Sequence, residues 1–150
     1  MRVVLQRVSS ARVTIAGRIA GQIERGLLIF VGIEASDAAV DGEWLAQKIA
    51  KLRIFTDAEQ HMNLSVVDLA GGILLVSQFT LHASTQKGTR PSFNAAARTE
   101  HARPLYEQFI AQLTAALGRQ VETGEFGAMM EVTLVNDGPV TLVIDSKIRE

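Results

Sequence analysis

The sequence predicts an α+β fold in which two helices pack on a curved, barrel-like mixed β-sheet. Runs of β-branched and apolar residues recur from one end of the chain to the other, whereas only two segments space their apolar residues as a helix does. With 150 residues, of which 47% are hydrophobic, the chain can bury about two thirds of its unfolded surface. We therefore expect residues 1–150 to form a single domain.

The first third of the chain favours strands. Residues 1–8 and 11–16 are rich in β-branched residues with partial alternation, which is typical of half-buried strands. Gly17 marks a tight turn into residues 18–23, and a second turn follows at residues 24–26. The apolar run of residues 27–31 is short enough to be a strand that is covered on both faces.

Two helices are expected. Ser36 and Asp37 offer an N-cap for a helix over about residues 38–52, in which apolar residues follow at helical spacing. Residues 69–79 then predict a buried strand. Thr99 can cap the second helix, which tolerates Pro104 only in its first turn and ends at Gly118.

The last part of the chain predicts strands over residues 121–123, 129–135 and 140–145. Between the last two lies Gly138-Pro139. Because proline cannot donate to a β-ladder, the pair is most simply interpreted as a turn, and a cis bond is a second possibility. Many strands and only two helices leave sheet edges or an apolar face to cover, for which a dimer is a natural solution.

Composition narrows the functional classes. No apolar run reaches the roughly 18 residues of a membrane span, and the start of the chain reads as a strand rather than a signal peptide, so we expect a cytoplasmic protein with no membrane partner. The absence of cysteine rules out disulfides and thiol catalysis. A net charge of −1 argues against extensive coating of nucleic acid, but not against a site that grips one end of an RNA.

Common catalytic motifs are missing. The three histidines, His61, His82 and His101, form no HExxH pair, and residues 57–61 lack the spacing of a known metal loop, so we expect no metal and no cofactor. There is no Gly-x-Ser-x-Gly elbow. Thr80 is the side chain that a nucleophile hypothesis would select, and the alternative is a threonine whose hydroxyl satisfies nearby backbone.

Several segments, in this order along nearly the whole chain, together resemble the D-aminoacyl-tRNA deacylase family. Each is weak alone, but their combination is a strong signal. One departure is the loop at residues 82–86, where family members often carry acidic and basic residues. The segments are Met1-Arg2-Val3-Val4-Leu5-Gln6-Arg7-Val8, Ser77-Gln78-Phe79-Thr80-Leu81, Lys87-Gly88-Thr89-Arg90-Pro91-Ser92-Phe93, Thr123-Gly124-Glu125-Phe126-Gly127-Ala128-Met129-Met130 and Gly138-Pro139.

The resemblance implies a D-aminoacyl-tRNA deacylase-like fold, a homodimer, and an editing esterase. The family hydrolyses the ester that joins a D-amino acid, or glycine, to the terminal ribose of tRNA; glycine mischarged on tRNA-Ala is an expected target. The catalytic segment would be Ser77, Gln78, Phe79 and Thr80. Because the ester is already activated, backbone N–H groups around Phe79 and Thr80 would bind the reacting carbonyl while the ribose 2′-OH assists.

The resemblance also implies how chirality is read. A cis Gly138-Pro139 pair, inserted from the partner subunit, would point backbone carbonyls at the α-carbon and reject L-amino acids. Phe126 and Met129 would shape a pocket near the terminal adenosine, although apolar residues at strand spacing more often belong to a core. The substrate contacts would thus centre on the 3′ aminoacyl-adenosine end of a D-aminoacyl-tRNA.

Two other functions stay open at this point. One is a Thr80-dependent hydrolase that forms a covalent intermediate with another acyl substrate. The other is a non-catalytic dimeric module that binds RNA ends. The presence of both the Ser-Gln-Phe-Thr and Gly-Pro motifs argues against the second, because a pure binding module has no need of both.

Overall fold

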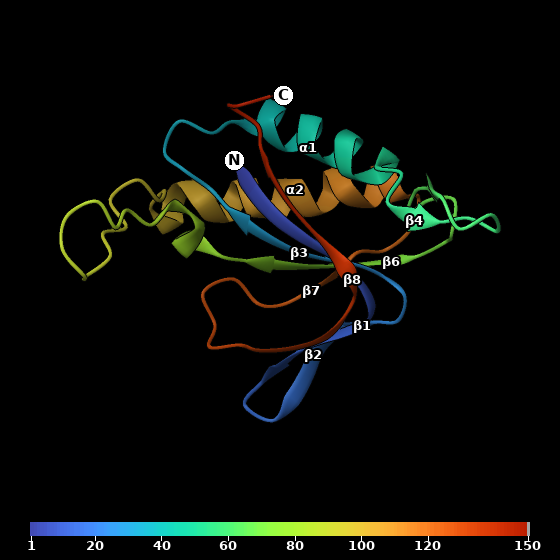
Figure 1. The fold of residues 1–150 in the computed structure, drawn as a ribbon. Coiled ribbons are helices and arrows are strands. Elements are labelled where there is room, and N and C mark those ends of the chain that lie inside the picture. Colours follow the sequence, from blue (N-terminus) through green and yellow to red (C-terminus); the bar gives the residue numbers. More distant parts are fainter. Residues whose placement is uncertain (150) are drawn as a thin grey trace.

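The predicted α+β class is confirmed by the computed structural model, which describes residues 1–149 (Figure 1). Two α-helices lie on a mixed sheet, and a short 3₁₀ helix, η1, follows one central strand. In chain order the elements are β1 (Arg2–Ile15), β2 (Arg18–Ile23), β3 (Gly26–Gly32), α1 (Ala39–Lys51), β4 (Phe55–Thr56), β5 (Met62–Leu64), β6 (Gly72–Ser77), η1 (Phe79–His82), α2 (Thr99–Leu117), β7 (Glu122–Thr123) and β8 (Glu131–Asp145).

The main sheet has the strand order β2-β1-β3-β6-β7, and β8 pairs with β1. β1 runs antiparallel to β3 along its first half, to β2 along its second half and to β8 along most of its length. β3, β6 and β7 run parallel. The two ends of this order approach each other, since a Cβ on Gly21 of β2 would lie 2.7 Å from the carbonyl oxygen of Thr123 of β7. The sheet is therefore a nearly closed barrel.

Alternate residues of the central strands enter two different cores, because side chains in a strand point to opposite faces. In β6, for example, Ile73 and Leu75 belong to the cluster that contains the helices, and Leu74 and Val76 to the cluster inside the barrel. The inner cluster also contains Val8, Ala11, Val13, Ile23 and Leu28. Both faces of β3 and β6 are thus covered, as their continuous apolar runs predict.

The helices lie side by side over one face of the sheet (Figure 1). The start of α1 differs from the prediction, because Asp37 does not cap it. Ala38 is the N-cap residue, and its N–H donates to the carboxylate of Asp41 at 2.9 Å. Asp37 instead accepts from the Glu34 N–H at 2.8 Å and pairs with the amino group of Met1. Thr99 is the first residue of α2 rather than its cap.

The strand boundaries also differ in three places. The two predicted strands over residues 1–8 and 11–16 are one strand, β1. Residues 129–135 and 140–145 likewise belong largely to one strand, β8, so Gly138-Pro139 lies inside a strand whose pairing with β1 shifts register between Gln6 and Ser10. The strand predicted over residues 69–79 is confined to Gly72–Ser77. The small β4–β5 hairpin was not predicted.

Among the described residues, no helix combines the length and the apolar character that crossing a membrane requires.

Phe109 should be a principal support of the helix layer. Its side chain is fully buried in the cluster between α2 and the sheet. We expect Phe109→Ala to lower the free energy of unfolding by about 3–5 kcal/mol, because it removes a large buried ring and leaves a cavity. Gln108→Ala, at the exposed neighbouring position, should change it by less than about 0.5 kcal/mol. Urea denaturation of both variants tests this, and equal losses would contradict it.

Candidate functional site

The Ser-Gln-Phe-Thr segment lies at the carboxyl end of two parallel strands. Ser77 is the last residue of β6 and pairs with Val31 of β3. The Gln78 N–H then donates to the Val31 carbonyl at 2.7 Å, and Phe79 begins η1. The predicted strand residues 78 and 79 thus leave the sheet and turn across its edge. The carboxyl edge of parallel strands is a common location for ligand sites.

η1 packs directly on the backbone of Gly32, the last residue of β3. A Cβ at Gly32 would lie 2.9 Å from the His82 Cδ2 atom, 2.9 Å from the Leu81 Cβ atom and 3.0 Å from the Gln78 carbonyl oxygen. Any larger residue would push η1 away from the sheet. Glycine at position 32 therefore fixes where the Ser-Gln-Phe-Thr segment lies.

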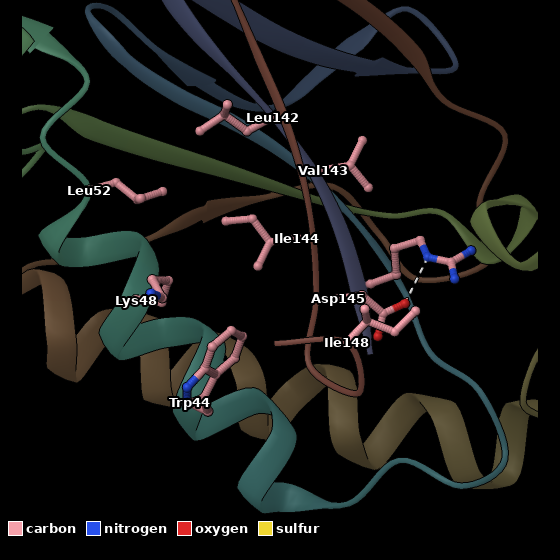
Figure 2. Close-up of a pocket in the computed structure, with 9 residues that line it drawn as sticks. Trp44, Lys48, Leu52, Leu142, Val143, Ile144, Asp145 and Ile148 are labelled. Atoms are coloured by element: carbon pink, nitrogen blue, oxygen red, sulfur yellow. Dashed lines mark hydrogen bonds and ion pairs between the residues drawn. The ribbon is translucent and has the colours of Figure 1, made fainter. Parts of the chain in front are cut away.

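Arg2 holds η1 from the side of β1. Its Nη1 donates to the Leu81 carbonyl at 2.9 Å, and its Nε pairs with the Asp145 carboxylate at 2.9 Å (Figure 2). Partial burial opposes ionisation of Asp145, but hydrogen bonds from the Lys147 N–H and from Arg2 lower its pKa. The charged pair thus ties η1 to both β1 and β8.

Inside the segment, the Gln78 side-chain amide donates to the Thr80 hydroxyl. No Asp, Glu, His or Lys side chain among residues 1–149 hydrogen-bonds to Ser77 or Thr80. His82 is buried, and its Nε2 has no partner within that range. The described side chains thus supply neither hydroxyl with an evident general base.

Phe126 lies at the same edge of the sheet. Thr123 of β7 pairs in parallel with Leu75 of β6, so the chain beyond Thr123 runs toward the level of Ser77. The Leu75 carbonyl accepts from both the Gly124 N–H and the Tyr106 hydroxyl, each at 3.2 Å. Tyr106 packs on Phe126 with ring centroids 5.6 Å apart, and burial raises the pKa of Tyr106 to about 12. Phe126 is therefore held by the sheet.

Met129 does not belong to the core. Its side chain is 91% exposed, just before β8 begins. Phe126 is half-buried in a turn that Gly127 makes with a φ of +77°. Neither residue lies in a strand, so the expectation that strand-spaced apolar residues here would be core residues is wrong for Met129.

Gly138-Pro139 has a cis peptide bond, as expected. Arg7 holds the residue before it: the Arg7 Nε donates to the Asp137 carbonyl at 2.8 Å, and the buried guanidinium also donates to the Ile54 carbonyl at 2.6 Å. Asn136 binds across the pair, with Nδ2 donating to the Arg7 carbonyl at 2.9 Å and to the Val140 carbonyl at 3.3 Å. Side chains on both sides thus fix this segment of β8.

Within one chain the Gly-Pro pair and the Ser-Gln-Phe-Thr segment lie apart. Arg7, beside Gly138-Pro139, pairs with Leu27, whereas η1 packs on Gly32 at the other end of β3. Five residue-to-residue steps along β3 separate Leu27 from Gly32, which is about 17 Å. The chain therefore does not bring the two predicted halves of the site together.

A pocket lies elsewhere on the surface. A pocket of about 620 Å³ lies between α1 and β8, where Trp44 and Leu52 face Leu142 and Ile144 (Figure 2). None of the predicted site residues lines it. Arg2 connects its rim to η1.

Asp57, Glu59 and His61 bring their ligand atoms within 4.8 Å of one another in the turn between β4 and β5. The Asp57 carboxylate there accepts the N–H groups of Glu59 at 2.9 Å and His61 at 3.0 Å. These bonds lower the pKa of Asp57. They explain the cluster as a side-chain-stabilised turn.

Comparisons with known proteins agree on one family. The family model described as D-Tyr-tRNA(Tyr) deacylase matches residues 4–145. Curated proteins named D-aminoacyl-tRNA deacylase include one from Opitutus terrae, 63% identical over all of both chains, and one from Koribacter versatilis, 60% identical over 98% of both.

Solved structures agree on the fold. The structure titled "c-Myc DNA Unwinding Element Binding Protein" superposes with a TM-score of 0.91 at 39% identity, covering 97% of this chain and 98% of that one. A probable eukaryotic D-amino acid tRNA deacylase, at 18% identity, shares the fold with a TM-score of 0.83 over 96% and 98% of the two chains. On these matches, the chain belongs to the D-Tyr-tRNA(Tyr) deacylase family of hydrolases.

Proposed function

We propose that this protein, acting as one domain in the cytoplasm, hydrolyses the ester bond of D-aminoacyl-tRNA and releases a free D-amino acid and tRNA. Family membership supports this activity, and one structural observation carries it: the Ser77–Thr80 segment is held rigidly at the carboxyl edge of the parallel strands by Gly32 and Arg2. Glycine on tRNA-Ala, which has no side chain to exclude, is a further substrate. The reaction uses no metal or cofactor.

The chemistry rests on positioning and on backbone N–H groups. The first N–H groups of a helix have no partner inside it, so those of Phe79 and Thr80 at the start of η1 are suited to bind the oxyanion formed at the ester carbonyl. A water molecule attacks the carbonyl carbon, the ester C–O bond breaks, and the ribose oxygen leaves with a proton. The neighbouring 2′-OH assists the proton transfer.

The second half of the site comes from another copy of the chain. Gly138-Pro139 lies at the level of Leu27 on β3, and the Ser77–Thr80 segment lies at the level of Gly32. These levels are about 17 Å apart, too far for both segments to touch the same ester. The homodimer places one subunit's Gly-Pro carbonyls against the α-carbon held by its partner, which rejects L-aminoacyl-tRNA and admits D-residues and glycine. Exposed apolar side chains of β8, Val135 and Val143, support an interface on this strand.

Phe126 and Met129 are proposed to contact the terminal adenosine. Phe126 lies at the same sheet edge as Ser77, and its ring is supported by Tyr106 and by Arg103, whose guanidinium is 5.1 Å from the ring centroid. Met129 offers an exposed, flexible thioether that can adapt to a base. The aminoacyl ester and the adenosine would then lie along one edge of the sheet.

The direct test is deacylation of purified D- and L-tyrosyl-tRNA. We expect release of tyrosine from the D-ester and little from the L-ester. Equal release from both esters would contradict the proposed stereochemistry, and binding of tRNA without release would favour a non-catalytic module.

Thr80→Val distinguishes the substrate-assisted reaction from a covalent one. The valine keeps the volume and branching of threonine but removes the hydroxyl, which here accepts from Gln78 and has no evident base among residues 1–149. We expect a loss of only about tenfold in the single-turnover rate, since removing a true nucleophile costs on the order of 10⁶-fold. A substrate ending in 2′-deoxyadenosine should react much more slowly. If the variant is inert while the deoxy substrate reacts normally, Thr80 is the nucleophile.

Gly32→Ala should damage the site by displacing η1. The added Cβ meets atoms of η1 at 2.9–3.0 Å, so we expect kcat/KM on D-tyrosyl-tRNA to fall at least tenfold, together with about 1–3 kcal/mol of stability. Gly17→Ala, in the β1–β2 turn with a φ of +80° and open space around it, is the control. It should lose stability to a similar extent but keep its activity. Full activity of Gly32→Ala would show that η1 is not catalytic.

Gly138→Ala should weaken discrimination between D- and L-substrates. A Cβ there would lie 2.5 Å from the Val140 nitrogen and 2.7 Å from the Asn136 Oδ1 atom, so the segment must shift. We expect the ratio of D- to L-tyrosyl-tRNA deacylation rates to fall by about tenfold or more. An unchanged ratio in a folded variant would show that this segment does not determine the preference for D-substrates.

A further inference from the structure

A charged loop follows directly after η1 and has no part in the chemistry described above. Residues 83–95 are all exposed, and the loop projects from the body of the protein at the yellow-green left edge of Figure 1. Ser84 and Ser92 close it with two backbone hydrogen bonds of 2.8 and 2.9 Å. Phe93 anchors it to η1 through an edge-to-face contact with Phe79, with ring centroids 5.2 Å apart.

This part of the chain carries positive charges and no negative ones. Residues 78–99 contain three of the 15 lysines and arginines and none of the 16 acidic residues. The cations, Lys87, Arg90 and Arg98, are exposed, and no hydrogen bond or ion pair to another described residue occupies them. The loop also carries several phosphate-compatible donors: Ser84, Thr85, Gln86, Thr89, Ser92 and Asn94.

We propose that Lys87 and Arg90 bind phosphates of the single-stranded 3′ end of tRNA, at the nucleotides that precede the terminal adenosine. This rests on the proposed function, because it assumes that the aminoacyl ester is held at Ser77–Thr80. The chain from Ser84 to Gly88 makes four residue-to-residue steps and reaches at most about 14 Å, the length of about four stacked nucleotides. The two cytidines before the terminal adenosine lie within that reach. Phosphate contacts of this kind orient a substrate without reading its sequence, which suits an enzyme that acts on many tRNAs.

The test compares three D-tyrosyl esters: full-length tRNA, the trinucleotide CCA, and adenosine without a phosphate. The variant is Lys87→Gln/Arg90→Gln. Its matched control is Lys48→Gln/Lys51→Gln, which removes two exposed cations from α1. For each protein, kcat and KM are measured between 50 and 200 mM salt, the range over which phosphate contacts weaken strongly.

We expect the loop variant to lose roughly tenfold in kcat/KM on tRNA and on the CCA ester through KM, and nothing on the adenosine ester. The slope of log kcat/KM against log salt should become shallower by about 1.4, since each single-strand phosphate contact contributes about 0.7. The α1 control should match the wild type. A loss on the adenosine ester, a loss confined to full-length tRNA, or no loss at all would overturn the proposal. Wild-type inactivity on D-tyrosyl-tRNA would instead refute the proposed function.

Discussion

Strand β1 is the element on which both halves of the proposed site depend. At the start of β1, Arg2 pairs with Gly32 of β3 and hydrogen-bonds to η1. Near its middle, the Arg7 side chain donates to the Asp137 carbonyl, and the Arg7 carbonyl accepts from Asn136. Asp137 and Asn136 lie next to Gly138-Pro139. A strand has a fixed rise of about 3.3 Å per residue, so the five residue-to-residue steps from Arg2 to Arg7 set the distance between the halves. The pairing of β1 with β3 on one side and β8 on the other keeps this spacing rigid.

The spacing has a functional consequence. Loops and side chains adjust by a few ångströms. Two positions on one continuous paired strand cannot close a separation of about 17 Å without breaking the sheet. A site made of η1 and Gly138-Pro139 therefore requires two chains. In a twofold dimer the same surface of each subunit meets its counterpart, so two equivalent sites form together. Such a dimer would bury the exposed apolar residues of β8, Val135 and Val143.

Much of the fold could be predicted because its signals are local. The helical spacing of Leu45 and Ile49, and the apolar run that became β3, correctly marked buried elements. The Gly-Pro pair was misinterpreted as a turn, since proline disfavours a strand, and only the pairing of both flanks with β1 shows that β8 continues. The cap at Asp37 failed because its carboxylate is taken by partners distant in sequence, including the Met1 amino group.

For the candidate site, too, some features were predicted from the sequence and others were not. The motif residues were found from their resemblance to a family, but the contacts that hold them in place were not predicted. Gly32 follows an apolar run, and glycine at a strand end usually marks a turn, so nothing in the sequence indicates that η1 packs on it. Arg7 stands in the first segment of the resemblance, but no role was predicted for it, although it is buried and binds two carbonyls. Both roles depend on contacts across the fold, which no local pattern encodes.

The claim that each site is shared between two subunits is tested most directly by mixing two variants, each of which damages a different half of the site. Gly32→Ala damages η1, and Gly138→Ala damages the Gly-Pro segment. If the subunits exchange at random, half of the dimers contain one of each variant, and one of their two sites combines an intact η1 with an intact Gly-Pro pair. The account predicts that about a quarter of all sites regain both the wild-type rate and the wild-type preference for D-substrates after the variants are unfolded and refolded together. No recovery, with mixed dimers shown by mass spectrometry, would contradict it.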